Sequence, residues 1–166
     1  MILREALAEE MGAVGALRVG AYEAQDLLGF NPSYADTLAA LGTDGRGTVL
    51  VAAGDGGDAA AGMLLGTVML DPWHDGSEVT RDPREAEVRA LAVAPQAQGQ
   101  GVGRALMLAV IDRARAAGAR RLLLSTQPTM KAAQALYLSL GFARLPDLDW
   151  SPAPGMTLLA FGLVIG

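Results

Sequence analysis

The sequence contains no cysteine, a single histidine and a single lysine. Without cysteine, the chain has no thiol nucleophile, no thiolate-bound metal and no disulfide framework, and we expect it to work in the reducing cytoplasm. A catalytic triad or a multi-histidine metal site would depend on His74 alone, so we expect neither a triad nor a bound metal. Because Met130 rather than glycine precedes Lys131, a phosphate loop that ends in Gly-Lys is excluded.

Long apolar runs are missing as well. The chain has no basic start followed by an apolar segment, and no uncharged apolar stretch of about 18 residues. We therefore expect no targeting segment and no membrane association. The 166 residues, of which 51% are hydrophobic and 19% charged, fit one compact domain that covers residues 1–166.

Dense runs of basic residues are also absent, and the net charge is −5. We therefore expect no binding to nucleic acid. Residues 1–87 carry 15 acidic and 5 basic side chains (net −10), whereas residues 88–166 carry 3 acidic and 8 basic side chains (net +5). This division suits a cationic ligand on the first half and an anionic ligand on the second, and chance scatter of surface charge is the alternative.

The first half of the chain alternates between helical and strand-like patterns. Ser33 follows Asn31-Pro32 and is expected to cap a short helix. A glycine-rich turn at 54–58 is expected to join the two strands of a hairpin. The expected elements are a strand at 2–6, helices at 7–22 and 34–41, strands at 48–53 and 63–70, and a polar loop at 71–84.

The second half has clearer boundaries. Gly118 and Gly141 each follow a segment with helical periodicity and are expected to end a helix. The expected elements are strands at 87–93, 121–126 and 156–165, a loop at 95–100, and helices at 101–117 and 128–140. This order indicates a mixed α/β sheet, with parallel pairing where a helix crosses over.

A glycine-rich segment lies where the strand at 87–93 leads into the helix at 101–117. Glycines let backbone approach a ligand closely, and the N–H groups and dipole of the following helix attract an anion, as does Arg104. A pyrophosphate therefore suits the loop. The spacing differs from a dinucleotide fingerprint because Leu106 occupies the position of the third glycine, and a tight turn without a ligand is the alternative. The segment reads Gln98, Gly99, Gln100, Gly101, Val102, Gly103 and Arg104.

This segment resembles the central motif of the GNAT superfamily of N-acetyltransferases. The motif comprises the strand from Glu87 to Val93 followed by Gln98-x-x-Gly101-x-Gly103. The resemblance continues through the strand at 122–125 and the pattern Ala133-x-x-Leu136-Tyr137-x-x-x-Gly141-Phe142, and covers about the last 80 residues. The first half resembles the family only in the order of its elements.

The resemblance implies a three-layer α+β fold with a mixed, mostly antiparallel central sheet and a splayed parallel strand pair. It implies acetyl-CoA as the cofactor, with the pyrophosphate on the backbone of 98–104. The strand that carries Glu87 is expected to contain a bulge and to bind the pantetheine arm through the backbone of Leu91, Ala92 and Val93. Met130 stands where many relatives have an asparagine that contacts this arm, and Gln127 and Thr129 are the nearby polar replacements.

The resemblance also implies the catalytic residues. Glu87 matches the glutamate that acts as a base toward the acceptor amine, through a water molecule, and Tyr137 matches the tyrosine that protonates the leaving thiolate. The alternatives are a strand carboxylate paired with Arg89 and a tyrosine of the core. We expect direct attack of the amine on the thioester in a ternary complex. A catalytically silent acyl-CoA-binding or sensor domain and a generic nucleotide-binding module are the alternatives.

The acceptor is expected to be a small-molecule or peptide amine. Candidate contacts lie in the variable parts of the chain, at Tyr34, Trp73, His74 and Trp150. An oxygen acceptor and a longer acyl group remain open. If the last strand is exposed at a sheet edge, it could pair with a second copy to form a homodimer.

Overall fold

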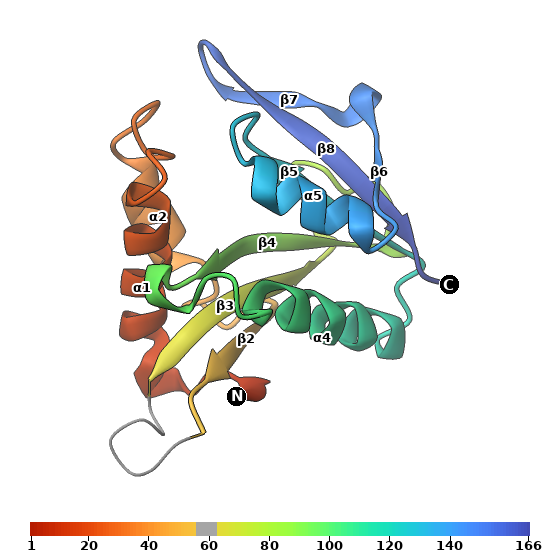
Figure 1. Cartoon of the computed structure of the whole chain (residues 1–166). Coiled ribbons are helices and arrows are strands. Elements are labelled where there is room, and N and C mark those ends of the chain that lie inside the picture. The colour runs from red at the N-terminus through yellow and green to blue at the C-terminus, as the bar shows by residue number, and fades with distance from the viewer. Residues whose placement is uncertain (56–62) are drawn as a thin grey trace. The chain divides into compact units, whose positions relative to one another are not determined.

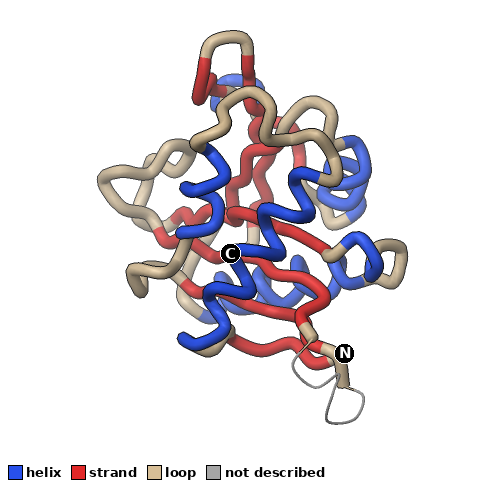
Figure 2. Tube along the Cα trace, turned by 90° about the vertical axis from the view of Figure 1, so that its left-hand side faces the viewer, coloured by secondary structure: helices blue, strands red, loops and turns tan. Residues whose placement is uncertain are grey.

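The computed structural model describes residues 1–55 and 63–166, so the glycine-rich turn expected at 54–58 lies largely outside the described residues. The chain forms two compact units, residues 1–70 with 90–110 and residues 71–89 with 111–166. Helices and strands occur in both units (Figures 1 and 2). Neither unit is a continuous stretch of chain, and the single domain over residues 1–166 stays a prediction.

In the first unit, β1 (Ile2–Glu5), β2 (Thr48–Ala53) and β3 (Leu64–Pro72) pair in that order, each antiparallel to the next, and the last two residues of β3 belong to the second unit. Ile2 lies opposite Ala53, and Thr48 lies opposite Leu70. β2 is β-branched and apolar along its length, and its last five residues are buried. All three strands were predicted.

Two helices complete the core of this unit. A short 3₁₀ helix, η1 (Ala8–Glu10), leads into α1 (Met11–Glu23), and α2 (Tyr34–Ala40) follows. Val14 of α1 packs with Val49, Val51 and Met69 of the sheet. The predicted cap of α2 is wrong, because the Ser33 hydroxyl donates to Asn31 Oδ1 at 2.7 Å instead of accepting from the helix.

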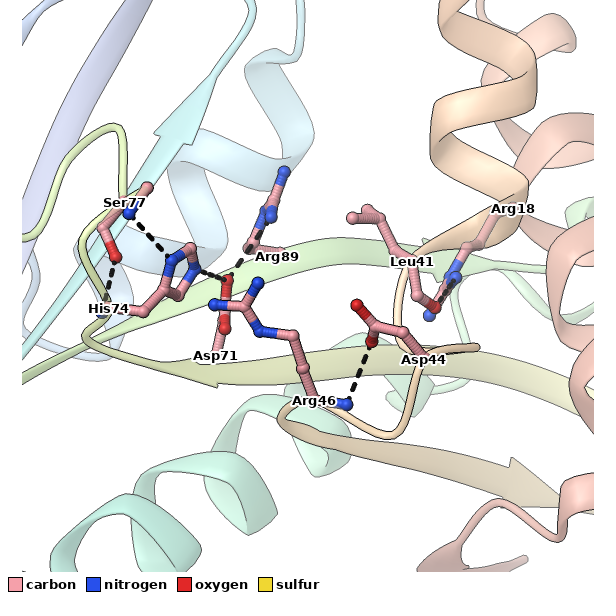
Figure 3. Close-up of polar contacts among 9 residues, drawn as sticks. Arg18, Leu41, Asp44, Arg46, Asp71, His74, Ser77 and Arg89 are labelled. Carbon is pink, nitrogen blue, oxygen red and sulfur yellow. Dashed lines mark hydrogen bonds and ion pairs between the residues drawn. The ribbon is translucent and has the colours of Figure 1, made fainter.

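A fully buried arginine joins α1 to the end of α2. Arg18 has no exposed surface, and its Nη1 donates to the carbonyl oxygen of Leu38 (3.1 Å) and to that of Leu41 (2.7 Å), the second of which Figure 3 shows. These carbonyls lie at the C-terminus of α2, where a helix has orphan acceptors and partial negative charge. The guanidinium therefore satisfies this helix end from inside the protein.

The second unit contains the parallel strand pair. β4 (Glu85–Val93) pairs with β5 (Arg121–Thr126) from Glu85↔Arg121 to Glu87↔Leu123, and residues 90–93 of β4 belong to the first unit. On its other side, β5 pairs along its whole length with the antiparallel strand β8 (Met156–Val164). The mixed α/β class, mostly antiparallel with one parallel pair, is confirmed.

Two further helices follow the strands of the motif. α4 (Val102–Ala116) spans both units and ends at Gly118, whose φ of +89° suits only glycine without strain. α5 (Lys131–Ser139) begins later than the predicted position 128, because the Met130 N–H bonds to the Gln127 carbonyl in a preceding turn. Gly141 follows α5 as predicted, with φ of +97°.

The segment before β8 is more regular than the sequence pattern indicated. It contains β6 (Ala143–Arg144), the 3₁₀ helix η3 (Pro146–Leu148) and β7 (Trp150–Ala153). Both β6 and β7 pair with β8, so β8 has neighbours on both sides. The last strand is therefore not a free sheet edge, so the condition under which it could pair with a second copy is not met, and homodimer formation stays a prediction without that support.

Among the described residues, no helix combines the length and the apolar character needed to cross a bilayer.

Replacing Arg18 with methionine should lower the free energy of unfolding by about 2–4 kcal/mol, because two buried carbonyls lose their donor while side-chain volume is kept. Urea unfolding of Arg18→Met measures this. The exposed Arg46 provides the control, since its replacement with methionine should change the stability by less than about 0.5 kcal/mol. Equal stability of the two variants would show that Arg18 does not support α2.

Candidate functional site

The predicted site residues are divided between the two units. The glycine loop at 98–104 and the backbone of 91–93 belong to the first unit, whereas Glu87 and Tyr137 belong to the second. β4 and η2 (Pro95–Ala97) connect Glu87 to the loop along the chain.

The glycine loop leads directly into the first turn of α4. Gly99 and Gly101 have φ of +77° and +80°, and residues 98–101 are exposed. A Cβ at either glycine would meet no atom within 4 Å, so the backbone conformation and not crowding favours glycine there. The first helical bond runs from Ala105 N–H to the Gly101 carbonyl (3.0 Å), which leaves the preceding N–H groups outside the helix ladder. The loop therefore fits a pyrophosphate.

A second glycine position fixes the start of α4 against the sheet. A Cβ on Gly66 of β3 would lie 2.9 Å from Val102 Cγ1 and 3.0 Å from the Ala92 carbonyl oxygen. Only a glycine permits this approach of α4 and β4 to β3. The helix that begins at Val102 is thus held by close packing of its first residue.

The backbone of β4 is irregular directly before the predicted arm-binding residues. Ala90 has φ of +54°, a left-handed conformation that is unusual for a residue with a side chain and is found at β-bulges. Leu91 and Val93 are half-buried, and Ala92 is buried. The irregularity agrees with the bulge expected in this strand.

Glu87 is a buried carboxylate without an ion pair. Its exposed fraction is 7%, and none of the residues that the structure describes forms a salt bridge with it. Burial raises the pKa of Glu87 to about 7; Arg89 acts in the opposite direction, and the carboxylates of Asp71 and Glu78 add to the rise. The expected alternative, a Glu87–Arg89 pair, is not formed. Glu87 can therefore accept a proton near neutral pH.

Arg89 is bound instead by Asp71 at the end of β3. Arg89 Nη1 lies 3.4 Å from Asp71 Oδ2, and His74 Nε2 lies 3.3 Å from the same oxygen (Figure 3). Because His74 Nδ1 accepts from the Gly76 N–H (3.1 Å), the ring proton resides on Nε2 and is donated to Asp71. His74, which was predicted to contact the acceptor amine, thus binds the carboxylate of Asp71 instead. Sequence reasoning missed Asp71, for which the only signal was its place at the end of a strand.

Trp150 lies on the same face of the sheet as Glu87. Paired residues and residues two apart in a strand share a face, so Glu87, Leu123 and Ser125 project to one side. Trp150 Nε1 donates to Ser125 Oγ at 3.0 Å, which holds the indole on that side. The structure therefore brings these two predicted residues to one surface of the second unit.

Tyr137 lies on the opposite face. Phe161 pairs with Leu124, which points away from Leu123, and the Tyr137 ring lies 6.1 Å from Phe161 and 5.9 Å from Phe142. Burial raises the pKa of Tyr137, so the phenol stays protonated at neutral pH. Its surroundings agree with the core alternative, and its role as a proton donor stays a prediction.

The remaining predicted contacts are more peripheral. Tyr34, in the first unit, is half-buried and packs against Phe30 with ring centroids 5.3 Å apart. Trp73 is 36% exposed in the loop that follows β3. Met130 points its sulfur toward Thr126, whose Oγ1 donates to Met130 Sδ at 3.4 Å, so its side chain does not replace the amide of the family asparagine.

Comparison with known sequences identifies one family. The model of the acetyltransferase (GNAT) family matches residues 16–142. Mycothiol acetyltransferase from Salinispora arenicola is 40% identical over 94 residues, which cover 51% of this chain and 30% of that protein. The same enzyme from Pseudarthrobacter chlorophenolicus is 42% identical over 92 residues, which cover 54% of this chain and 27% of that protein. The chain thus spans less than a third of the length of these curated relatives.

Solved structures share the fold over nearly the whole chain. A GNAT-family acetyltransferase from Staphylococcus aureus Mu50 has a TM-score of 0.77 at 13% identity, with 99% of both chains covered. Ribosomal-protein-alanine N-acetyltransferase from Brucella melitensis has a TM-score of 0.70 at 23% identity, again with 99% of both covered. A Salmonella typhimurium protein solved with its cofactor acetyl-CoA has a TM-score of 0.68 at 22% identity, covering 100% of this chain and 94% of that one. These likenesses confirm the predicted fold.

Replacing Ala90 with glycine should raise the free energy of unfolding by about 0.5 kcal/mol, because relief of the left-handed strain exceeds the entropy lost on folding. Ala86→Gly, at a regular and buried position of the same strand, should lower it by about 1 kcal/mol. Chemical unfolding of both variants measures the difference. A loss of stability in both would mean that Ala90 is not strained.

Replacing Glu87 with glutamine should stabilise the protein at about pH 8 by up to about 3 kcal/mol. The folded carboxyl keeps its proton up to a pKa of about 7, against 4.5 ordinarily, so its contribution to stability is complete below about 4.5 and is lost as the pH rises through 7. Urea unfolding at about pH 5 and pH 8 tests this, with the exposed Glu9→Gln as the control. An equal effect of Glu87→Gln at both pH values would refute the raised pKa.

Proposed function

Because the chain belongs to the acetyltransferase (GNAT) family, we propose that it transfers an acetyl group from acetyl-CoA to an amine by direct attack within a ternary complex. The observation that carries this proposal is the buried Glu87 carboxylate, free of an ion pair, on the strand that leads into the glycine loop. Burying a carboxylate without a cationic partner costs stability, and such groups are concentrated at functional sites.

The glycine loop would hold the cofactor. The backbone N–H groups of 98–104, with the dipole of α4, would bind the pyrophosphate, and the exposed loop leaves room for it. The backbone of Leu91, Ala92 and Val93 would hydrogen-bond the pantetheine arm. When bound, acetyl-CoA supplies an acetyl group that its thioester activates.

Glu87 would remove the proton from the acceptor. An aliphatic amine has a pKa of about 10, so it arrives largely as an ammonium ion that has no free electron pair. A carboxylate with a pKa of about 7 is a stronger base than an ordinary glutamate and is still ionised above neutral pH. The proton passes from the amine to Glu87, directly or through a water molecule, and the neutral nitrogen becomes nucleophilic.

Tyr137 would supply the second proton. The phenol is protonated at neutral pH and so has a proton to give to the leaving sulfur, although burial, which raises its pKa, makes it a weaker acid than an exposed tyrosine. Trp150 would contact the acceptor, since its indole is held on the same face as Glu87.

The names of the relatives suggest which acceptors to test. The curated relatives are mycothiol acetyltransferases, and two solved structures are ribosomal-protein-alanine N-acetyltransferases. We therefore propose an amine on a small thiol-containing metabolite or an alanine N-terminus as the first candidates, with polyamines and amino sugars as the wider set. The absence of cysteine supports action in the cytoplasm.

Release of free CoA from acetyl-CoA across this panel of amines tests the function. With the acceptor that gives turnover, Glu87→Gln and Tyr137→Phe should each lower kcat about 100-fold, because each loses one proton-transfer group. Leu138→Ala, at a 56% exposed position of α5, is the matched control and should retain wild-type kcat. Unchanged kcat in both site variants would overturn the assigned roles.

The same assay distinguishes the silent-domain alternative. A binding or sensor domain would be stabilised against heat by CoA but would release no thiol with any amine. A generic nucleotide-binding module would be stabilised by ATP or NAD at least as well as by CoA.

A further inference from the structure

Two opposite charges stand close together on β4 without pairing. Glu87 and Arg89 are two residues apart, so they share a face with their Cα atoms about 7 Å apart, within reach of a flexible arginine. A buried carboxylate normally takes such a partner. Arg89 instead reaches Asp71 Oδ2 at 3.4 Å, and Glu87 forms no ion pair with any described residue.

We propose that Asp71 is a positioning residue that holds the Arg89 guanidinium away from the Glu87 carboxylate. The proposal rests on the proposed role of Glu87 as the base. It assigns to Asp71 no contact with acceptor or cofactor, only the task of competing for a neighbouring cation.

Burial and a second hydrogen bond fix the position of the Asp71 carboxylate. Its exposed fraction is 5%, and its Oδ2 also accepts from His74 Nε2 at 3.3 Å (Figure 3). His74 is itself fixed, because its backbone N–H donates to Ser77 Oγ at 3.0 Å and its Nδ1 accepts from Gly76. His74 Nε2 and Arg89 Nη1 thus both lie against the same oxygen of Asp71.

The charged groups around Glu87 explain how the Asp71–Arg89 pair affects the basicity of the Glu87 carboxylate. Arg89 on β4 lowers the pKa of Glu87, whereas Asp71 from the end of β3 and Glu78 from the following loop raise it. The β5 residue opposite Glu87 is the apolar Leu123. A guanidinium in contact with a carboxylate lowers the carboxylate pKa by about 1 to 3. Release of Arg89 would therefore convert a base of pKa about 7 into a much weaker one.

A double-mutant cycle tests the proposal with a readout independent of turnover. The Glu87 carboxyl is titrated by ¹³C NMR in the wild type, Asp71→Asn, Arg89→Gln and the double variant, with Glu87→Gln used to assign the signal. If Asp71 acted only through its own charge, the two effects on the pKa would add. If Asp71 restrains Arg89, Arg89→Gln should raise the pKa by at least about 1 more in the Asp71→Asn background than in the wild type.

The catalytic readout should follow the same pattern. The limb of kcat/KM that Glu87 controls should move to lower pH in Asp71→Asn and return toward about 7 in the double variant. Asp112→Asn is the matched control, because it breaks another aspartate–arginine pair of 3.4 Å, with Arg115 on α4, and should leave the titration of Glu87 unchanged.

The outcomes separate this proposal from the function it rests on. Additive effects in the cycle would overturn the role of Asp71 whatever the activity. An unchanged kcat in Glu87→Gln would overturn the role of the base and leave the cycle interpretable. If Asp71→Asn does not fold, Asp71→Ser, which leaves room for water, replaces it in the same cycle.

Discussion

The short parallel ladder between β4 and β5 is the constraint on which the candidate site depends. Its register, from Glu85↔Arg121 to Glu87↔Leu123, determines which side chains share a face. The Glu85 carboxylate accepts from Arg121 Nε at 2.7 Å and from the Arg81 backbone N–H at 2.8 Å, which anchors the start of the ladder. A slip of one residue between β4 and β5 would put Glu87 and Ser125, and with Ser125 the indole of Trp150, on opposite faces.

Two of the buried charged side chains, Arg18 and Glu87, have contrasting surroundings. Arg18 is fully enclosed, but carbonyl oxygens at a helix end accept its hydrogen bonds, so its charge supports the fold. Glu87 is nearly as enclosed and lacks an ion pair, so its charged form is disfavoured. Arg89, two residues along the same strand, is held by Asp71 instead. One buried charge thus contributes to stability, whereas the other opposes it and acquires basicity.

Local patterns in the sequence accounted for most of the helices and strands and indicated the glycine loop, whereas the choice of Glu87 came from the family resemblance; the roles of both stay predictions. The strand at 48–53 is apolar from Val49 to Ala53, and glycine has few substitutes where φ is positive, as at Gly99. The errors arose where distant or competing contacts decide. Ser33 bonds to Asn31 instead of the helix, and β7 forms because β8 is available to pair with it. The Asp71–Arg89 pair joins residues 18 apart and leaves no periodic signal.

The hydrogen bond between Trp150 and Ser125 also gives the protein an optical property. Only two tryptophans are present, and Trp150 is the one fixed on the face that carries Glu87. An indole with a bound N–H and a half-buried ring has an emission spectrum that depends on what covers it. With Trp73 replaced by phenylalanine, Trp150 is the remaining tryptophan emitter. Its emission maximum then distinguishes a solvent-exposed surface beside Glu87 from one that is covered.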